Sequence, residues 1–358
     1  MGFTCEFLPC AHLKTLILAY KSVSQHAARE STFVTWDFSE QLKQWGPKAT
    51  YQPVSLSAAR EYCREVTTEH YENFSVVSRL LPKELHPHFQ SVYAFCRWSD
   101  DLGDEVADHG ESLELLAWWR EELAACEKGD PKHPVFVALR ETIHEYEIPR
   151  EPFENLISAF EQDQTKGSYA THEELRDYCR RSADPVGRIV LYLFREATPE
   201  NFELSDRICT GLQLANFWQD VARDDEIGRV YLPQEDRDQF GYTADMFGQK
   251  CSTPEFLELL KHEVSIARQY LLSGRPLVDQ LPTQYQVDID LFVRGGLCIL
   301  DRIEQVEFRT WETRPVVTKG DGVKLFLFAV LRKWGRRLKL VSAYPEVAPP
   351  MLREEVSA

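Results

Sequence analysis

From about Leu56 onward, apolar side chains recur at the three- and four-residue spacing of helices, and the alternation typical of strands is scarce. Proline or glycine separates these stretches at Leu81-Pro82, Gly129-Asp130-Pro131, Ile148-Pro149, Thr198-Pro199, Leu232-Pro233 and Arg275-Pro276. No shift in composition marks a linker, and no internal repeat is present. The pattern predicts a single all-α domain over residues 51–342.

The two ends of the chain lack this periodicity. We expect residues 1–50 to be a variable, poorly ordered leader rather than an export signal. The apolar stretch at residues 13–20 is short, is interrupted by Lys14 and lacks a clear cleavage site. Residues 343–358 contain three prolines and are predicted to form a flexible tail. No run of about 18 apolar residues occurs, so we expect no membrane-spanning helix.

Two of the predicted helices carry a narrow polar stripe in apolar surroundings, which reverses the usual arrangement of a surface helix. The first stripe consists of Tyr93, Arg97, Asp100 and Asp104, and the second of Gln213, Asn216, Asp220 and Asp224. Buried carboxylates need partners, and metal ions are common ones. Two aspartate pairs that face each other would hold hard divalent cations and, through them, a substrate diphosphate. For Asp108, which forms a further pair with Asp104, we favour a solvated helix face.

Charge and composition exclude several other classes of function. The formal net charge of −16 makes nucleic acid an unfavourable partner, and it means that an anionic substrate needs bridging cations. The nine cysteines show no Cys-x-x-Cys pattern, which favours reduced, buried thiols in a cytosolic protein. Motifs of serine hydrolases, P-loop proteins, dinucleotide-binding domains and zinc proteases are all missing from the sequence.

Two further segments carry candidate chemistry. Gly228 follows the second stripe and is expected to end its helix, so that Arg229 and Tyr231 fold back over a cavity mouth. Arginine there would bind a diphosphate in a bidentate manner, although a surface loop is the alternative. Residues 178–187 predict an interrupted helix, in which Tyr178 either stabilises a carbocation and relays a proton or simply packs in the core.

The segment from Lys324 to Val341 is basic and bears aromatic residues within an acidic protein. A helix of this composition can lie on an anionic membrane surface. The alternative is a terminal helix whose apolar face packs on the domain while its basic residues face water.

Together, these motifs resemble the squalene/phytoene synthase family over residues 62–334. The matching segments are Tyr-Ala-Phe-Cys-Arg-x-x-Asp-Asp-x-x-Asp-Glu from Tyr93, Tyr-Cys at Tyr178, and Gln-Leu-x-Asn-x-x-x-Asp-x-x-x-Asp with Gly-Arg-x-Tyr-Leu-Pro from Gln213 to Pro233. The resemblance implies an all-α isoprenoid synthase fold, with helices around a central cavity. It also implies Mg²⁺ bound by Asp100, Asp101, Asp104, Asp220 and Asp224. Finally, it implies diphosphate binding by Arg97, Arg229, Tyr231, Gln219 and Asn73, and catalytic roles for Tyr93, Tyr178, Gln213 and Asn216.

Two departures from the family pattern indicate which branch of the family the chain resembles. Asn73 lies where condensing members usually carry a Ser-x-Ser-Phe-like segment, and Gln219 replaces an arginine before the second aspartate motif. The surrounding segments resemble the bacterial hydroxysqualene synthase branch. That branch implies presqualene diphosphate as substrate and water as the group that quenches the final cation. No nicotinamide-binding pattern is visible in the sequence, so we expect no nicotinamide cofactor.

The leading hypothesis is therefore a Mg²⁺-dependent enzyme that makes hydroxysqualene or squalene for hopanoid or other triterpenoid lipids. An alternative within the family is a head-to-head condensing enzyme that makes presqualene diphosphate, squalene or phytoene from prenyl diphosphates such as farnesyl diphosphate. An alternative of another class is a non-catalytic, isoprenoid-binding assembly subunit. Besides the prenyl diphosphate, we expect neighbouring pathway enzymes and a membrane surface as partners, with a cytoplasmic location at the inner face of the membrane.

Overall fold

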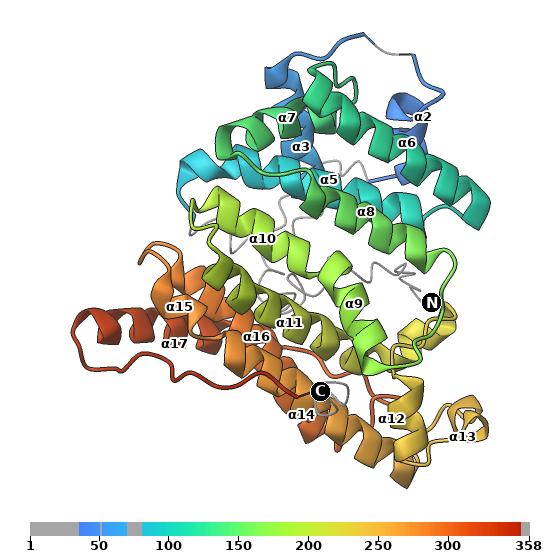
Figure 1. Ribbon diagram of the computed structural model, residues 1–358, viewed down its shortest axis with the longest axis vertical. Helices are drawn as coiled ribbons and strands as arrows, with labels where there is room; N and C mark the ends of the chain where they lie inside the picture. Colours follow the sequence, from blue (N-terminus) through green and yellow to red (C-terminus); the bar gives the residue numbers. More distant parts are fainter. Residues whose placement is uncertain (1–35, 51, 70–80, 352–358) are drawn as a thin grey trace, which may run out of the picture.

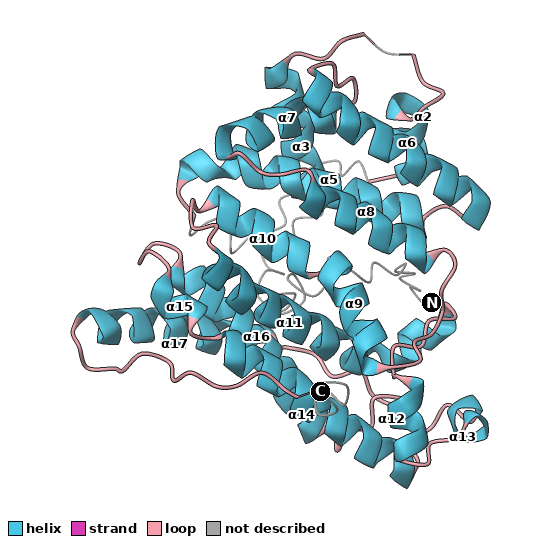
Figure 2. Ribbon diagram, in the orientation of Figure 1, coloured by secondary structure: helices cyan, strands magenta, loops and turns pink. Residues whose placement is uncertain are grey.

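The computed structural model describes residues 36–50, 52–69 and 81–351. Throughout these residues the regular elements are helices, apart from one isolated bridge between Ser168 and Val230 (Figure 2). This confirms the predicted all-α class. The α-helices are α2 (Phe38–Trp45), α3 (Leu56–Glu69), α5 (His86–Asp104), α6 (His109–Lys128), α7 (Pro134–Tyr146), α8 (Glu151–Asp163), α9 (His172–Ser182), α10 (Asp184–Leu193), α11 (Pro199–Glu226), α12 (Gln234–Gln239), α13 (Ala244–Gly248), α14 (Pro254–Gly274), α15 (Leu277–Gln280), α16 (Gln286–Gln305) and α17 (Lys319–Arg337), and a 3₁₀ turn, η1 (Lys83–Leu85), precedes α5.

The helices form two packed groups, with α9 and α10 between them (Figure 1). In the first group, α5 packs on α3, α6, α7 and α8, while in the second α11 packs most extensively on α14 and also contacts α16. Helix α10 packs on both α8 and α11 and so connects the two groups. The helices that carry the two aspartate stripes, α5 and α11, therefore belong to opposite groups.

The proline- and glycine-containing breaks all fall at or between helix ends. Thr198 caps α11 by accepting a hydrogen bond from the Asn201 amide, with Pro199 as the first helical residue. Gly129 ends α6 in the left-handed conformation, at a φ of 83°. The predicted interruption near Tyr178 is also present, because α9 ends at Ser182 and α10 begins at Asp184, with Ala183 at a φ of −118° between them.

The segment expected to be a leader contributes to the fold. Helix α2 buries Phe38, whose ring packs edge-on against Trp98 at a centroid distance of 5.3 Å. The Trp36 indole donates a hydrogen bond to Asp101 Oδ2 at 3.1 Å. The boundary expected at residue 50 is therefore wrong for residues 36–50, whose weak periodicity reflects one short helix. Residues 1–35 lie outside the described part.

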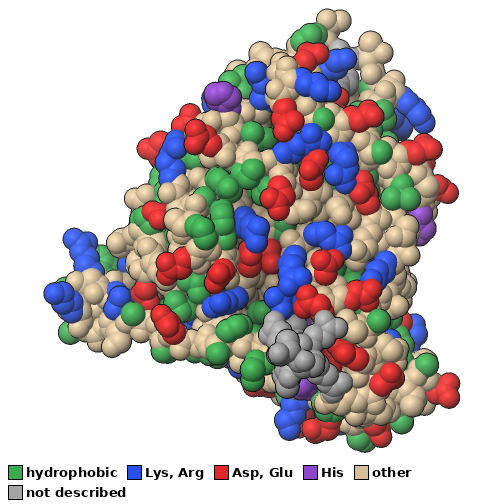
Figure 3. Space-filling view, in the orientation of Figure 1, with side chains coloured by type: hydrophobic (Ala, Val, Ile, Leu, Met, Phe, Trp, Pro, Cys, Tyr) green, Lys and Arg blue, Asp and Glu red, His purple; other side chains and the backbone are tan. Residues whose placement is uncertain are grey.

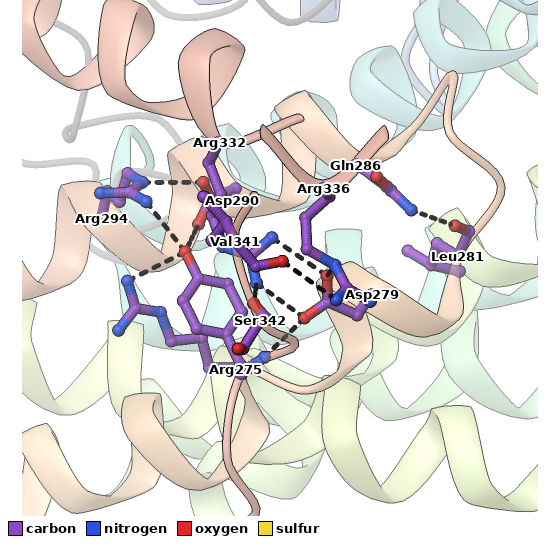
Figure 4. Close-up of polar contacts among 11 residues, drawn as sticks. Arg275, Asp279, Leu281, Gln286, Asp290, Arg294, Arg332, Arg336, Val341 and Ser342 are labelled. Carbon is purple, nitrogen blue, oxygen red and sulfur yellow. Dashed lines mark hydrogen bonds and ion pairs between the residues drawn. The ribbon is translucent and has the colours of Figure 1, made fainter. Parts of the chain in front are cut away.

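The expectation of a flexible tail is likewise wrong for residues 343–351, because Tyr344 is anchored in a cluster of charged side chains. Its hydroxyl donates to Asp290 at 2.7 Å and accepts from Arg275 and Arg294, each at 2.9 Å (Figure 4). Its ring also lies against the Arg275 and Arg332 guanidinium groups, 3.7 and 3.5 Å from the ring centroid. Prolines disfavour a helix here, but they do not prevent contacts made by one aromatic side chain.

Candidate active site

The first aspartate stripe lies on α5 and is enclosed on nearly every side. Asp100 and Asp101 are each 1% exposed, and the Asp104 side chain is 7% exposed. Burial, reinforced by the neighbouring Asp104 carboxylate, raises the pKa of Asp100 well above its usual value. So much buried negative charge requires cations close by.

The second stripe lies on α11, where Gln213, Asn216, Asp220 and Asp224 are between 0% and 6% exposed. The helix departs from helical geometry at Asp220, with φ −107° and ψ 15°. Arg314, from the loop after α16, donates to both oxygens of this carboxylate, with Nη2 3.1 Å from Oδ2. Next to it, the Gln219 side-chain amide donates to the Pro315 carbonyl at 2.5 Å. The loop after α16 therefore fixes the start of the second motif.

Arg229 connects the two motifs. Its Nη2 lies 2.9 Å from Asp104 Oδ1 on α5, and its backbone amide donates to the Asp224 carbonyl at 2.8 Å. The turn depends on Gly228, which adopts a φ of 73°. Beside it, a Cβ on Gly167 would lie only 2.7 Å from the Gly228 carbonyl oxygen. These glycines allow the loop after α11 to pack closely against the loop after α8, which directs Arg229 towards Asp104.

An aromatic group adjoins Arg229. The Tyr178 hydroxyl donates to Asp163 Oδ2 at 3.0 Å, and its ring lies 5.5 Å from that of Tyr169. The rings of Phe217 and Tyr231 stack at 3.7 Å with an interplanar angle of 10°. A small cavity of about 10 Å³, lined in part by Phe217, Tyr231, Asp224 and Arg229, lies between the aromatic group and the second motif.

Arg97 and Asp101 form a separate pair on α5. Arg97 Nε donates to Asp101 Oδ2 at 3.0 Å, and this oxygen also accepts the Trp36 indole N–H. Burial raises the pKa of Asp101 to about 7, although Arg97 acts in the opposite direction. Metal binding by Asp101 stays a prediction, since its carboxylate is bound by Arg97 and Trp36. Tyr93, two turns earlier on the helix, is 4% exposed, and Asn73 lies outside the described residues.

Three arginines from different parts of the chain pair with motif aspartates, and Arg97 also lies 3.8 Å from Asp100 Oδ2. The pairs are Arg97–Asp101, Arg229–Asp104 and Arg314–Asp220. Sequence reasoning found the first two arginines through their motifs but missed Arg314, which is 94 residues from its partner and follows no local pattern. It also missed Asp163, the last residue of α8, which is likewise outside any motif.

The donor set suits a hard divalent cation. Asp100, Asp104, Asp220 and Asp224 offer only carboxylate oxygens, the ligands that Mg²⁺ prefers. Asp104 Oδ2 is buried and has no hydrogen-bond partner in the described part of the chain, although its other oxygen binds Arg229. This oxygen is therefore available to a cation, and cation binding by the remaining three carboxylates stays a prediction.

Comparison with known proteins agrees with this arrangement. The sequence model of the family "Squalene/phytoene synthase" matches residues 67–321. A phytoene synthase from Arthrospira platensis is 28% identical, covering 78% of this chain and 95% of its own. A hydroxysqualene synthase from Rhodopseudomonas palustris is 33% identical, covering 64% of this chain and 78% of its own.

A solved structure supports the same assignment. The crystal structure of the squalene synthase HpnC from Alicyclobacillus acidocaldarius superposes with a TM-score of 0.69 at 44% identity, covering 72% of this chain and 97% of that one. A dehydrosqualene synthase that is 21% identical superposes with the same TM-score, over 77% of this chain and 97% of its own, and shows the same fold. The chain therefore belongs to the squalene/phytoene synthase family, whose members are enzymes that use prenyl diphosphates.

Proposed function

We propose that this enzyme converts presqualene diphosphate to hydroxysqualene, with Mg²⁺ as its cofactor and water as the quenching nucleophile. Supporting this choice are the 44% identity to the HpnC squalene synthase and the 33% identity to hydroxysqualene synthases from two bacteria. A presqualene diphosphate synthase from Rhodopseudomonas palustris is 34% identical over 48% of this chain. Overall identity therefore separates the two reactions poorly, and the argument depends on individual residues.

The observation that carries the proposal is that Gln219, a neutral residue, is buried and hydrogen-bonded to the backbone. Condensing two prenyl diphosphates requires a site that neutralises two diphosphate groups, and arginine at this position would add one cation. Gln219 is neutral and 3% exposed, and its amide is committed to the Pro315 carbonyl. The arginines found at the motifs already offset motif aspartates, with Arg97 near both Asp100 and Asp101. This arrangement suits a substrate with one diphosphate.

In this reaction the carbon–oxygen bond to diphosphate breaks, and its electron pair leaves with the diphosphate. Bound Mg²⁺ would supply positive charge that stabilises this leaving group. Arg229 and Arg97 would bind the diphosphate, while the faces of Tyr178, Phe217 and Tyr231 would stabilise the carbocation. Water then forms the new carbon–oxygen bond and loses a proton, for which the Tyr178 hydroxyl, hydrogen-bonded to Asp163, offers a relay.

The test supplies presqualene diphosphate or farnesyl diphosphate with Mg²⁺, each with and without NADPH, and identifies products by mass spectrometry. We expect hydroxysqualene and diphosphate from presqualene diphosphate, with NADPH changing neither rate nor product. Efficient formation of presqualene diphosphate or phytoene from prenyl diphosphates would favour the condensing alternative, and squalene formed only with NADPH would indicate a reductive enzyme. Substrate binding without Mg²⁺-dependent diphosphate release would favour the assembly subunit.

We also propose that α17 contacts an anionic membrane surface, where an apolar product could be released. One face of α17 packs on α16 through Leu325 and Ala329. The opposite face exposes large apolar side chains within an arc of about 80°. These residues, each 50–64% exposed, are Val323, Leu327, Leu331, Trp334 and Leu338.

Charge favours a lipid surface as the partner of this exposed face. Lys324, Lys333, Arg336, Arg337 and Lys339 accompany it in a protein of net charge −16, and basic side chains gather where α17 projects from the molecule, at the left of Figure 3. Apolar anchors flanked by cations are typical of interfacial helices. No helix in the described ranges meets the length and hydropathy needed to cross a bilayer.

The prediction is salt-sensitive binding to anionic vesicles, because attraction between exposed charges is screened over about 10 Å at 0.1 M salt. In co-sedimentation, Leu331→Ser/Trp334→Ser should release the protein from the vesicles, whereas Leu56→Ser, at a 37% exposed leucine on α3, should not. Equal recovery in the supernatant with anionic and neutral vesicles at low salt would contradict the proposal.

A further inference from the structure

A second cluster of buried ionisable side chains lies where α9, α12 and α14 meet, and it includes none of the motif residues. His172 begins α9, Asp236 lies in α12 and Glu263 lies in α14. One potential ligand atom from each lies within 4.8 Å of the other two. The three residues are 5%, 4% and 0% exposed, so water in bulk does not reach them.

The cluster leaves several enclosed polar atoms unsatisfied. His172 Nε2 lies 3.2 Å from Glu263 Oε2. By contrast, His172 Nδ1, Glu263 Oε1 and Asp236 Oδ2 have no hydrogen-bond partner in the part of the chain that the structure describes. Leaving a buried polar group unsatisfied is costly, and native structures contain few such groups. Three such atoms in a single cluster indicate that a proton or a cation lies between them.

The charges indicate that this species is positive. Two carboxylates face one imidazole, and among the described ion pairs neither carboxylate meets a lysine or arginine. The nearby Glu235 adds further negative charge and accepts the His172 backbone N–H at 2.6 Å. The two carboxylates therefore share this space only with a proton or a metal ion between them.

One separation in the cluster matches that of two ligands on the same metal ion. Imidazole nitrogen and carboxylate oxygen bind Zn²⁺ at about 2.0–2.2 Å, which places neighbouring ligand atoms roughly 3.0–3.5 Å apart. The 3.2 Å separation of His172 Nε2 and Glu263 Oε2 lies within this range. We propose that His172, Glu263 and Asp236 bind one divalent transition-metal cation, with the chemistry of Zn²⁺, that ties α9, α12 and α14 together.

Such an ion would stabilise the packing of these helices and would take no part in the reaction. Helix α9 carries Tyr178, and α12 directly follows the loop of Arg229 and Tyr231. The loops are already joined by hydrogen bonds from the Gln234 and Glu235 amides to the Tyr169 and Ala170 carbonyls, each 3.0 Å. The ion would fix the position of Tyr178 on α9 relative to Tyr231 in the loop before α12. We therefore assign it a structural role distinct from that of the aspartate motifs.

The test uses the full chain carrying Asp100→Asn and Asp220→Asn, so that the aspartate motifs contribute little to metal binding. After chelation and dialysis, we expect titrated Zn²⁺ to bind at one equivalent per chain and to raise Tm. Adding His172→Gln or Glu263→Gln should abolish both effects, whereas His144→Gln, at an exposed histidine, should change neither.

Two results would overturn the proposal. The first is a Tm that responds to neither Zn²⁺ nor chelator, with no metal in protein purified without chelator. The second is unchanged Zn²⁺ stoichiometry in Glu263→Gln. In either case a proton shared between the Asp236 and Glu263 carboxylates would explain the cluster. The Tm of Glu263→Gln would then be at least as high as that of its parent at neutral pH. If His172→Gln does not fold, Asp236→Asn and the metal content of the parent chain decide the question.

Discussion

Replacing Asp220 by asparagine is expected to lower kcat by at least about 100-fold while the helical fold survives, because the amide cannot supply the negative charge that holds a divalent cation. The same loss is expected for Asp100→Asn, Asp104→Asn and Asp224→Asn. Diphosphate release with excess Mg²⁺ measures activity, and circular dichroism measures helix content. Since Asp220 also pairs with Arg314, this variant additionally loosens the loop after α16.

Asp108→Asn is the matched control. Asp108 lies just after α5 and caps α6 by accepting a hydrogen bond from the Glu111 amide at 2.8 Å. Asparagine caps helices about as well as aspartate, so this variant should retain activity and stability. Full activity of Asp220→Asn, or activity that survives excess EDTA, would contradict metal binding by the motifs.

Replacing Arg229 by glutamine should have the next largest effect, a loss of about 10²–10³ in kcat, comparable to the removal of one preorganised donor from a developing anion. The change also leaves Asp104 without its cation in a buried site. Arg229→Lys should restore only part of the rate, because lysine lacks the planar pair of donors that matches a diphosphate. Steady-state rates and substrate affinity, measured together, would separate lost binding from lost catalysis.

Arg223→Gln serves as the control for Arg229, since Arg223 is an exposed arginine near the end of α11, the helix that precedes the Arg229 loop. It changes the net charge equally but leaves the loop after α11 intact. If Arg223→Gln and Arg229→Gln reduced activity to the same extent, long-range charge would explain the loss, and Arg229 would have no specific role.

The sequence predicted those features that depend on local spacing. Residues three, four and seven positions apart share a helix face regardless of tertiary structure, so the burial of both aspartate stripes followed from periodicity alone. The break at Ala183 and the turn at Gly228 were equally local, since proline and glycine restrict or release the backbone where they stand.

Features that depend on distant partners could not be predicted. The Arg314–Asp220 pair joins residues 94 positions apart, and nothing in the sequence near Arg314 indicates a buried aspartate as its partner. Asp163 reaches Tyr178 only because α8 packs against α9. The ends were misjudged for the same reason, since Phe38 and Tyr344 contribute through contacts with other helices rather than through any pattern of their own.

The anchoring of Tyr344 bears on how the protein can be shortened or fused for expression. Cutting the chain before this residue would remove the hydroxyl shared by Arg275, Arg294 and Asp290 and the ring that lies against Arg332. Helix α17 would then be held by its packing on α16 and by the ion pairs of Arg332 and Arg336 with Asp279 and of Asp321 with Arg302. An affinity tag should therefore follow Ala358, and trimming from the other terminus should stop before Trp36, whose indole binds Asp101.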